Sequence, residues 1–178
     1  MNISEIKKHL EKLNLVPGER VADFGAGSGI YTIEAARQIG HKGKVYAIEI
    51  QKELLEKIKQ LASQESLDNI EYFWGDLEEN GGSKLGDSSV DAVILANIIF
   101  QVEKKDILLQ EAYRVLKPLG RLLIIDWSGS YSNLGPPEEY VVKEEEANQL
   151  AAQAGLHQED NFRAGDYHYG LIFTKQAS

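Results

Sequence analysis

Hydrophobic positions along the chain follow two alternating periods. Short apolar runs between turn residues predict buried strands at 20–24, 44–48, 70–74, 91–95 and 121–126. Apolar residues spaced three or four positions apart predict helices at 28–39, 52–64, 104–116 and 143–154, with a further stripe at Ile3, Ile6, Leu10 and Leu13. Strands and helices that alternate in this way are typical of a parallel sheet with helices on both faces.

The end of the chain predicts a different strand direction. Two strands are expected at 157–163 and 167–174, separated only by the short segment 164–166. Three residues are too few for a crossover, so these two strands should pair antiparallel. The predicted fold is α/β, a doubly wound, Rossmann-like seven-stranded sheet, mostly parallel with an antiparallel last strand. A turn at 117–120 is expected to end the helix at 104–116.

Composition narrows the class of protein. A chain of 178 residues with 43% hydrophobic and 26% charged residues suits a single domain over residues 1–178. The absence of cysteine excludes disulfides, thiolate metal sites and a cysteine nucleophile, and we predict no metal site. A net charge of −9 disfavours nucleic acid as a partner. Without a signal-peptide core or an apolar run of ~20 residues, we expect no membrane span and a cytoplasmic location.

A glycine-rich turn, VADFGAGSG, follows the first predicted strand and opens a helix. Its three alternating glycines leave bare backbone that can approach a ligand, although a tight turn without a ligand is the simpler alternative. The dinucleotide fingerprint would need glycine at Ile30, and no Gly-Lys-Ser/Thr follows for a phosphate loop. Asp23, just before the turn, would repel a pyrophosphate and suits a cationic group such as an ammonium.

VADFGAGSG resembles motif I of the class I methyltransferases that use S-adenosylmethionine (SAM). VYAIE, WGDLE and DAVILANIIFQV resemble the strand ends that follow in that class. EAYRVLKPLGRLLIIDW, AQAGL and HYGLIFTK resemble the ubiquinone- and menaquinone-biosynthesis (methyltransferase type 11) group, so the resemblance spans most of the chain. Many members of that group carry histidine where this chain has Gln101, and the lack of cysteine rules out thiol-assisted arsenic methylation.

The resemblance implies a SAM site at the carboxyl ends of the strands, where such sheets bind ligands. Glu49 would accept hydrogen bonds from the ribose hydroxyls, Asp76 and the Leu77 N–H would meet the adenine, and Ile50 would cover one face of it. The backbone of Gly25, Ala26 and Gly27, with Asp23 and Asn97, would hold the methionine end. The cofactor-binding residues are therefore predicted to be Asp23, Gly25, Ala26, Gly27, Glu49, Ile50, Asp76, Leu77 and Asn97. Turn or capping roles remain the alternatives for Glu49, Asp76 and Asn97.

A pocket for the methyl acceptor is expected beside the cofactor, because the last hairpin should turn at the same edge of the sheet. The residues predicted to line it are Phe100, Gln101, Trp127, Tyr131 and Tyr167. His168 is the candidate general base, with a plain strand histidine as the alternative. The N-terminal stripe is expected either to cover the site or simply to pack on the domain.

The function predicted is methyl transfer from SAM to an unidentified, small-molecule acceptor. A non-catalytic SAM-binding module and an NAD-dependent oxidoreductase are the alternatives. The second is disfavoured by Ile30 and by the antiparallel end of the sheet.

Overall fold

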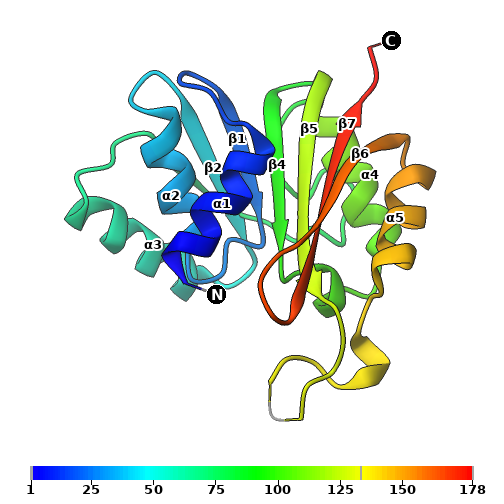
Figure 1. The fold of residues 1–178 in the computed structure, drawn as a ribbon. Coiled ribbons are helices and arrows are strands. Elements are labelled where there is room, and N and C mark those ends of the chain that lie inside the picture. The colour runs from blue at the N-terminus through cyan, green and yellow to red at the C-terminus, as the bar shows by residue number, and fades with distance from the viewer. Residues whose placement is uncertain (1, 133, 178) are drawn as a thin grey trace.

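A computed structural model describes residues 2–132 and 134–177 of the chain. Seven strands form one sheet in the order β3-β2-β1-β4-β5-β7-β6 (Figure 1). The strands are β1 (Arg20–Phe24), β2 (Lys44–Glu49), β3 (Ile70–Trp74), β4 (Val90–Ala96), β5 (Leu116–Trp127), β6 (Leu156–Arg163) and β7 (His168–Lys175). Strands β1 to β5 pair parallel, and β7 pairs antiparallel with both β5 and β6. The predicted fold class and the antiparallel last strand are confirmed.

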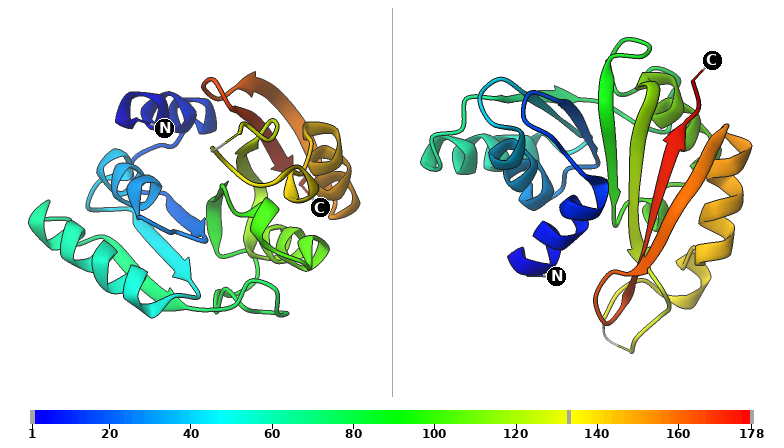
Figure 2. Two further views of the ribbon diagram at one scale, coloured as in Figure 1. Left: turned by 90° about the horizontal axis from the view of Figure 1, so that it is seen from below. Right: turned by 45° about the horizontal axis from the view of Figure 1, so that its top comes forward.

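In the described part of the chain, five α-helices cover the two faces of this sheet, as Figures 1 and 2 show. They are α1 (Ile3–Leu13), α2 (Ile30–Ile39), α3 (Lys52–Gln64), α4 (Lys105–Val115) and α5 (Glu144–Gln153), with short 3-10 turns η1 (Ile99–Gln101) and η2 (Glu138–Tyr140). One apolar core joins α1, α2 and α3 to the sheet, and a second joins α4 and α5. Along β5, Leu123 and Ile125 belong to the first core and Leu122 and Ile124 to the second, as the two-residue period of a strand requires.

The N-terminal stripe forms the helix α1, which a capping box begins. The Asn2 side chain accepts the Glu5 N–H at 3.0 Å, and the Glu5 carboxylate accepts the Asn2 N–H at 2.7 Å. Ile6, Leu10 and Leu13 are buried, and Ile3 at the start of the helix is exposed. The stripe therefore packs on the sheet along most of its length.

Two predicted boundaries differ from the structure by more than one residue. The second helix begins at Ile30 and not at residue 28, because Gly29 has a positive φ of 79° and the turn continues through it. Residues 117–120 do not form a turn between elements, because α4 ends at Val115 and β5 begins at Leu116. Val90 pairs with Leu116 but Ala92 pairs with Arg121. Residues 117–120 therefore form an irregularity within β5. A proline is tolerated there because a bulge leaves backbone groups outside the ladder.

The carboxyl ends of the parallel strands and the β6–β7 turn lie at the same edge of the sheet. Asp126 and Trp127, the last residues of β5, pair with Tyr169 and His168. This confirms the predicted position of the hairpin, although Tyr167 precedes β7 and is not part of it. The long segment between β5 and α5 extends beyond this edge (Figure 1).

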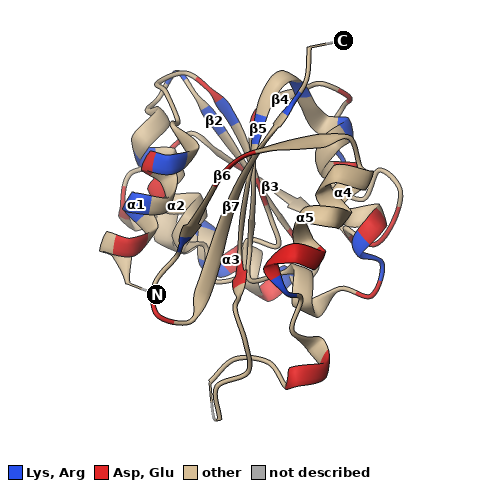
Figure 3. Cartoon of the chain, turned by 45° about the vertical axis from the view of Figure 1, so that its right-hand side comes forward, with Lys and Arg blue, Asp and Glu red and all other residues tan. Residues whose placement is uncertain are grey.

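The negative charge of the chain is concentrated in part on the segment that leads into α5. Glu138 and Glu139 begin η2, and Glu144, Glu145 and Glu146 form the first turn of α5 (Figure 3). Carboxylates in a first helical turn are favourable, because the N–H groups there carry a partial positive charge. Among the described residues, no helix is long and apolar enough to cross a membrane.

Candidate functional site

A cavity of about 320 Å³, which we call the Glu49 cavity, opens at the carboxyl ends of β1, β2 and β3. Six residues predicted from the sequence to bind the cofactor line it, namely Gly25, Gly27, Glu49, Ile50, Asp76 and Leu77. Sequence reasoning missed Leu54, Glu78, Ile98 and Val102, which complete much of the wall. Glu78, Ile98 and Val102 lie within the quoted motifs WGDLE and DAVILANIIFQV, but the motifs do not indicate which of their residues face a cavity. Leu54 lies outside every quoted motif, and its position depends on how α3 packs.

The Glu49 carboxylate connects two turns of the backbone. Its Oε2 accepts the Gly27 N–H at 2.9 Å, and its Oε1 accepts the N–H groups of Ile50 and Gln51 at 2.9 and 3.0 Å. The side chain is buried but still faces the cavity. Carboxylate oxygens can accept further hydrogen bonds, so the group can also meet a vicinal diol. The predicted ribose role and the alternative turn role are therefore compatible at Glu49.

The three glycines of the turn have different functions, although all have positive φ values between 53° and 79°. A Cβ on Gly25 would collide with Ile98, and a Cβ on Gly29 would come within 2.6 Å of Ile58. A Cβ on Gly27 would meet nothing closer than the Gly25 carbonyl oxygen at 3.7 Å. Only Gly27 therefore leaves open space for a ligand. The other two glycines are required by packing within the protein.

The N–H groups of the turn are already used within the chain. Gly25 and Ala26 donate to the Ile48 carbonyl at 2.9 and 3.0 Å, and Gly27 donates to Glu49. A pyrophosphate needs free N–H donors at such a turn. An ammonium needs acceptors, which the carbonyl oxygens of the turn can supply. This arrangement supports the inference from Asp23 that the turn suits a cationic group.

Asp23 lies behind the turn and does not line the Glu49 cavity. It is 2% exposed, and the Thr32 hydroxyl donates to its Oδ2 at 2.5 Å. Burial raises the pKa of Asp23 to about 6, against the opposing effect of the Thr32 hydrogen bond. The negative charge of Glu49 also raises this pKa. Asp23 therefore does not contact the cavity, and its predicted role toward an ammonium stays a prediction that could act only through its field behind the turn.

Acidic residues after β3 shape the far wall of the Glu49 cavity. Asp76 Oδ1 accepts the Glu78 N–H at 2.9 Å, which is the turn role considered for it, and Oδ2 takes no part in that turn. Glu78 Oε1 accepts the N–H groups of Glu103 and Lys104 at 2.7 and 2.8 Å. Glu78 thus satisfies free donors at the start of α4 and fastens the loop after β3 to the loop after β4.

A second cavity of about 310 Å³, which we call the Tyr31 cavity, lies on the other side of the glycine turn. It shares Gly25, Gly27 and Gln101 with the Glu49 cavity, so the two lie next to each other. Its other lining residues are Ile6, Ala26, Ser28, Ile30, Tyr31, Ala96 and Asn97. Sequence reasoning anticipated Ala26, Asn97 and Gln101 near the cofactor but missed Tyr31 and Ile30 on the first turn of α2.

Asn97 adopts a positive φ of 57° at the end of β4. Its N–H donates to the Ile125 carbonyl at 2.8 Å, and its own carbonyl accepts Gln101 Nε2 at 2.6 Å. Its side-chain Oδ1 is buried without a hydrogen-bond partner among the described residues. A buried polar atom without a partner is costly. Asn97 lines the Tyr31 cavity, and no group among the described residues satisfies its Oδ1.

Asp126 holds the loop after β4, which carries Asn97 and Gln101. Sequence reasoning did not select Asp126 as a site residue. This fully buried residue accepts the Trp127 N–H at 2.8 Å and the Ile99 N–H at 3.0 Å. The N–H of Phe100 also donates to it, so this is how the predicted pocket residue Phe100 is held. Burial raises the pKa of Asp126 to about 6, although the backbone donors oppose that effect.

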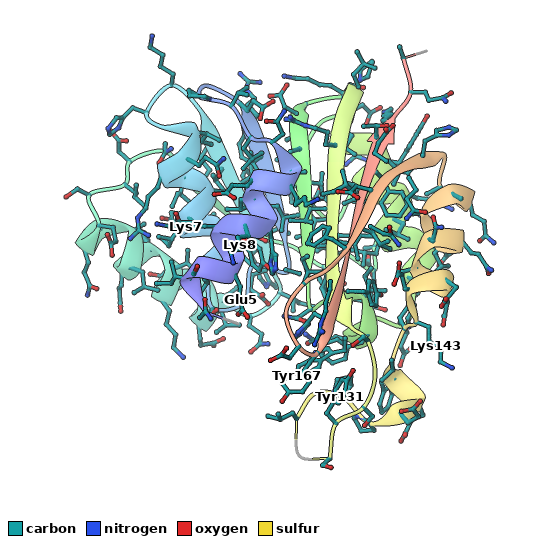
Figure 4. All side chains as sticks on the ribbon, viewed as in Figure 1. Glu5, Lys7, Lys8, Tyr131, Lys143 and Tyr167 are labelled. Carbon is teal, nitrogen blue, oxygen red and sulfur yellow. The ribbon has the colours of Figure 1, made fainter. Side chains whose placement is uncertain are left out.

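The remaining predicted pocket residues form a separate aromatic cluster. The rings of Trp127 and His168 lie 4.2 Å apart, and those of Tyr131 and Tyr167 lie 4.8 Å apart. Figure 4 shows Tyr131 and Tyr167 close together beyond the end of the sheet. The Ser128 hydroxyl binds both the Tyr131 hydroxyl at 2.7 Å and the Tyr167 carbonyl at 2.9 Å. None of these four aromatic residues lines the Glu49 or Tyr31 cavity, and His168 lines a third cavity with Arg163 and Asp166. Gln101 alone of the predicted acceptor residues faces the glycine turn.

His168 is a poor general base in this position. The residue is 7% exposed, and burial is the main reason that its pKa falls to about 4. A base this weak takes up protons inefficiently near neutral pH. Its Nε2 is buried with no partner among the described residues, so the alternative of a strand histidine bonded to backbone is not observed for this atom. Its ring packs against Trp127 instead.

Comparisons with known proteins agree with this geometry. Residues 15–170 match the family model described as a methyltransferase domain. The chain is 30% identical over 112 residues to the arsenite methyltransferase of Halobacterium salinarum and 32% identical over 113 residues to the ubiquinone/menaquinone biosynthesis C-methyltransferase of Vibrio cholerae. Each match covers 63% of this chain but only 28% and 42%, respectively, of those proteins.

A solved structure is similar over nearly the whole length of both chains. A SAM dependent methyltransferase from Aquifex aeolicus is 28% identical, with a TM-score of 0.86 over 98% of this chain and 99% of that one. These findings confirm the resemblance to class I SAM-dependent methyltransferases and give no support to an NAD-dependent oxidoreductase. The chain belongs to the methyltransferase domain family.

Proposed function

We propose that this chain transfers the methyl group of SAM to a small-molecule acceptor. The observation that carries the proposal is the position of Glu49, which joins the glycine turn to the start of α3 and faces a cavity of about 320 Å³. A nucleoside with a free ribose diol satisfies that carboxylate. The Tyr31 cavity continues from the same turn and has room for the methionine end and an acceptor.

The residues present fit this cofactor. Asp76 and Leu77 lie on the wall where the adenine would end, and Ile50, 54% exposed, offers an apolar surface to its face. Gly27 leaves open space beside the turn, since a side chain is absent and nothing else fills its place. The unpartnered Asn97 Oδ1 and the turn carbonyls would accept the ammonium N–H groups. Asp23 would add a negative field from behind.

Methyl transfer requires the chain mainly to align the acceptor with the methyl group of SAM. Bound SAM supplies a methyl group on a sulfonium, which is a good leaving group. The chain would hold the acceptor in line and exclude water, which can account for much of a barrier. Among the described residues, the side chains that line the Tyr31 cavity include no carboxyl, imidazole or amine group. An acceptor that must lose a proton would release it to solvent or carry its own base.

A non-catalytic SAM-binding module is the second candidate. One observation favours it, because the candidate base His168 lies outside both cavities at the glycine turn. Calorimetric binding of SAM does not distinguish this module from an enzyme. A methyl-transfer assay does, because a module leaves the methyl group on SAM with every acceptor.

Calorimetry of SAM, its demethylated product and NAD tests the proposal first. We expect micromolar binding of SAM and of the product and no binding of NAD. Transfer of labelled methyl from SAM is then measured over a panel of neutral, anionic and cationic small molecules, with an oligonucleotide included. We expect transfer to a small molecule and none to the oligonucleotide. Binding of NAD without binding of SAM would overturn the proposal.

A further inference from the structure

The loop between β3 and β4 forms one wall of the Glu49 cavity and has no regular structure of its own. Residues 75–89, all of which the structure describes, contain neither a helix nor a strand. The cavity wall comes from the start of this loop, at residues 75–78. A loop without a helix or strand keeps one conformation only through contacts with other elements. Helix α4 supplies those contacts.

Glu111 on α4 is buried, with 3% of its surface exposed, and it binds the middle of this loop. Its Oε1 accepts the Ser83 N–H at 3.1 Å and the Ser83 hydroxyl at 2.5 Å, and its Oε2 accepts the Gly81 N–H at 3.3 Å. Arg114 donates to both carboxylate oxygens at 2.8 Å and to the Leu85 carbonyl at 2.8 Å.

The carboxylate of Glu111 is a charged acceptor despite its burial. Burial raises the pKa of Glu111, but the hydrogen bonds from Arg114 and Ser83 outweigh that effect and hold the pKa below its usual range. The group is therefore ionised near neutral pH. Hydrogen bonds to an ionised acceptor are stronger than those between neutral groups, so Glu111 fixes the position of Ser83 firmly.

The part of the loop that Glu111 binds packs directly against the cavity wall. A Cβ on Gly82 would lie 1.7 Å from the Asp76 carbonyl oxygen, and a Cβ on Gly75 would lie 2.1 Å from the Gly82 carbonyl oxygen. The Gly82 N–H also donates to the Glu79 carbonyl at 2.9 Å. The two stretches of backbone leave no space between them, so a shift of residues 82–83 would move Asp76 as well.

We propose that Glu111 is a positioning residue for recognition of the purine base of the cofactor. Glu111 lines neither the Glu49 cavity nor the Tyr31 cavity, so it acts only through the loop that it holds. Asp76 and the Leu77 N–H in that loop then distinguish a 6-amino purine from a 6-oxo purine. This inference rests on the proposed function, which brings the adenine of SAM to these two residues.

The distinction follows from hydrogen-bond polarity. A carboxylate oxygen accepts from the amino group of adenine, and a backbone N–H donates to its ring nitrogen N1. A 6-oxo purine carries a carbonyl oxygen and an N1–H in the same places. It would therefore bring an acceptor to the Asp76 carboxylate and a donor to the Leu77 N–H. Both mismatches depend on the exact position of the loop.

The test compares two ligands that differ only in the base. S-adenosylhomocysteine is the demethylated product of SAM, and S-inosylhomocysteine carries a 6-oxo purine in place of adenine. Calorimetry with the full chain measures both affinities, and we call their ratio the base preference. We expect the natural chain to bind S-adenosylhomocysteine at least about tenfold more tightly, since two hydrogen bonds become mismatched pairs in the other compound.

Three variants separate positioning from simple stabilisation of the fold. Glu111→Gln should lower the base preference about fivefold, because the amide is neutral and has only one acceptor oxygen for the loop. Ser83→Ala removes only the hydroxyl and should lower the preference by less, about threefold. Glu34→Gln is the matched control, since Glu34 is a buried glutamate that binds Arg37 three positions later at 2.8 Å but lines neither cavity. It should leave the base preference unchanged.

Circular dichroism first establishes that each variant is folded. A folded Glu111→Gln protein with an unchanged base preference would mean that Glu111 only stabilises the fold, and would overturn the inference. Where Glu111→Gln does not fold, an unchanged preference in Ser83→Ala overturns it in the same way. A preference that also falls in Glu34→Gln would overturn it, because the preference would then follow stability.

The natural chain separates this inference from the proposed function. Equal affinities of the natural chain for the two compounds would overturn the role of the loop in base recognition while the proposed function stands. Failure of the natural chain to bind S-adenosylhomocysteine would overturn the proposed function and this inference with it.

Discussion

The two cavities on either side of the glycine turn are built from different contacts. In the Glu49 cavity, three carboxylates, Glu49, Asp76 and Glu78, each bind backbone N–H groups of neighbouring turns. In the Tyr31 cavity, the polar atoms are uncharged and one of them, Asn97 Oδ1, lacks a partner among the described residues. The Glu49 cavity is therefore braced by local loop structure, whereas the Tyr31 cavity depends on helix α1 and on contacts between distant segments.

The largest expected effect comes from Gly27, one of the three residues that line both cavities. Gly27→Val should abolish SAM binding, because the side chain would occupy open space beside the turn and oppose the positive φ of 53°. Calorimetry measures the loss. Gly40→Val is the matched control, since Gly40 also has a positive φ, of 66°, but its Cβ would meet nothing within 4 Å and it lines neither cavity.

The control should lose stability and keep its affinity for SAM. Circular dichroism of both variants shows whether the fold is retained. A folded Gly27→Val protein with normal SAM affinity would mean that this turn does not hold the cofactor.

Glu49→Ala should weaken SAM binding by about tenfold or more, since two charge-assisted hydrogen bonds to the ribose would be lost. The structure adds a second consequence, because three backbone N–H groups lose their acceptor. Thermal unfolding without ligand should therefore also show a lower melting temperature. Glu56→Ala, an exposed change beyond the first turn of α3, is the control and should alter neither quantity. Unchanged SAM affinity in a folded Glu49→Ala protein would remove Glu49 from the site.

The buried carboxyl behind the turn predicts a pH dependence. Burial raises the pKa of Asp23 from 3.8 to about 6, so folding favours its protonated form. Its contribution to the free energy of unfolding is complete below about pH 4 and is lost as the pH rises through about 6. Two pKa units correspond to a loss on the order of 3 kcal/mol.

Urea unfolding measured from pH 4 to pH 8 checks this sign. Asp23→Asn keeps an oxygen for the Thr32 hydroxyl and should lose less stability over that range than the natural chain. Glu103→Gln, where the natural carboxylate is exposed, should follow the natural chain. Parallel curves for all three proteins would contradict the pKa assigned to Asp23.

The smallest expected effect is at His168. His168→Phe should leave the affinity for the cofactor product unchanged, because His168 lines neither cavity at the glycine turn and a phenyl ring can keep the contact with Trp127. Calorimetry measures that affinity. A large loss would restore His168 to the cofactor site, and a loss of turnover of about 10²-fold or more at constant affinity would restore the role of general base.

The sequence by itself determined the strands and helices, and it determined that the glycine turn and Glu49 meet at one edge of the sheet. The apolar runs predicted β1 at Arg20–Phe24 and β3 at Ile70–Trp74 with the boundaries that the structure has. The glycine turn and Glu49 were predictable because motif and strand order bring them together over a short stretch of chain. Such signals are local, since strand periodicity and turn conformation depend on neighbouring residues.

Only the tertiary structure decided which glycine faces open space and where the aromatic residues gather. Ile98 and Ile58 fill the positions beside Gly25 and Gly29, and neither contact has a trace in the motif. Trp127 and His168 lie at the expected edge, but they stack on each other away from the glycine turn. His9 and Tyr31 meet across 22 positions of the chain because α1 docks beside α2. Docking of this kind depends on packing between whole elements, which no local pattern of residues encodes.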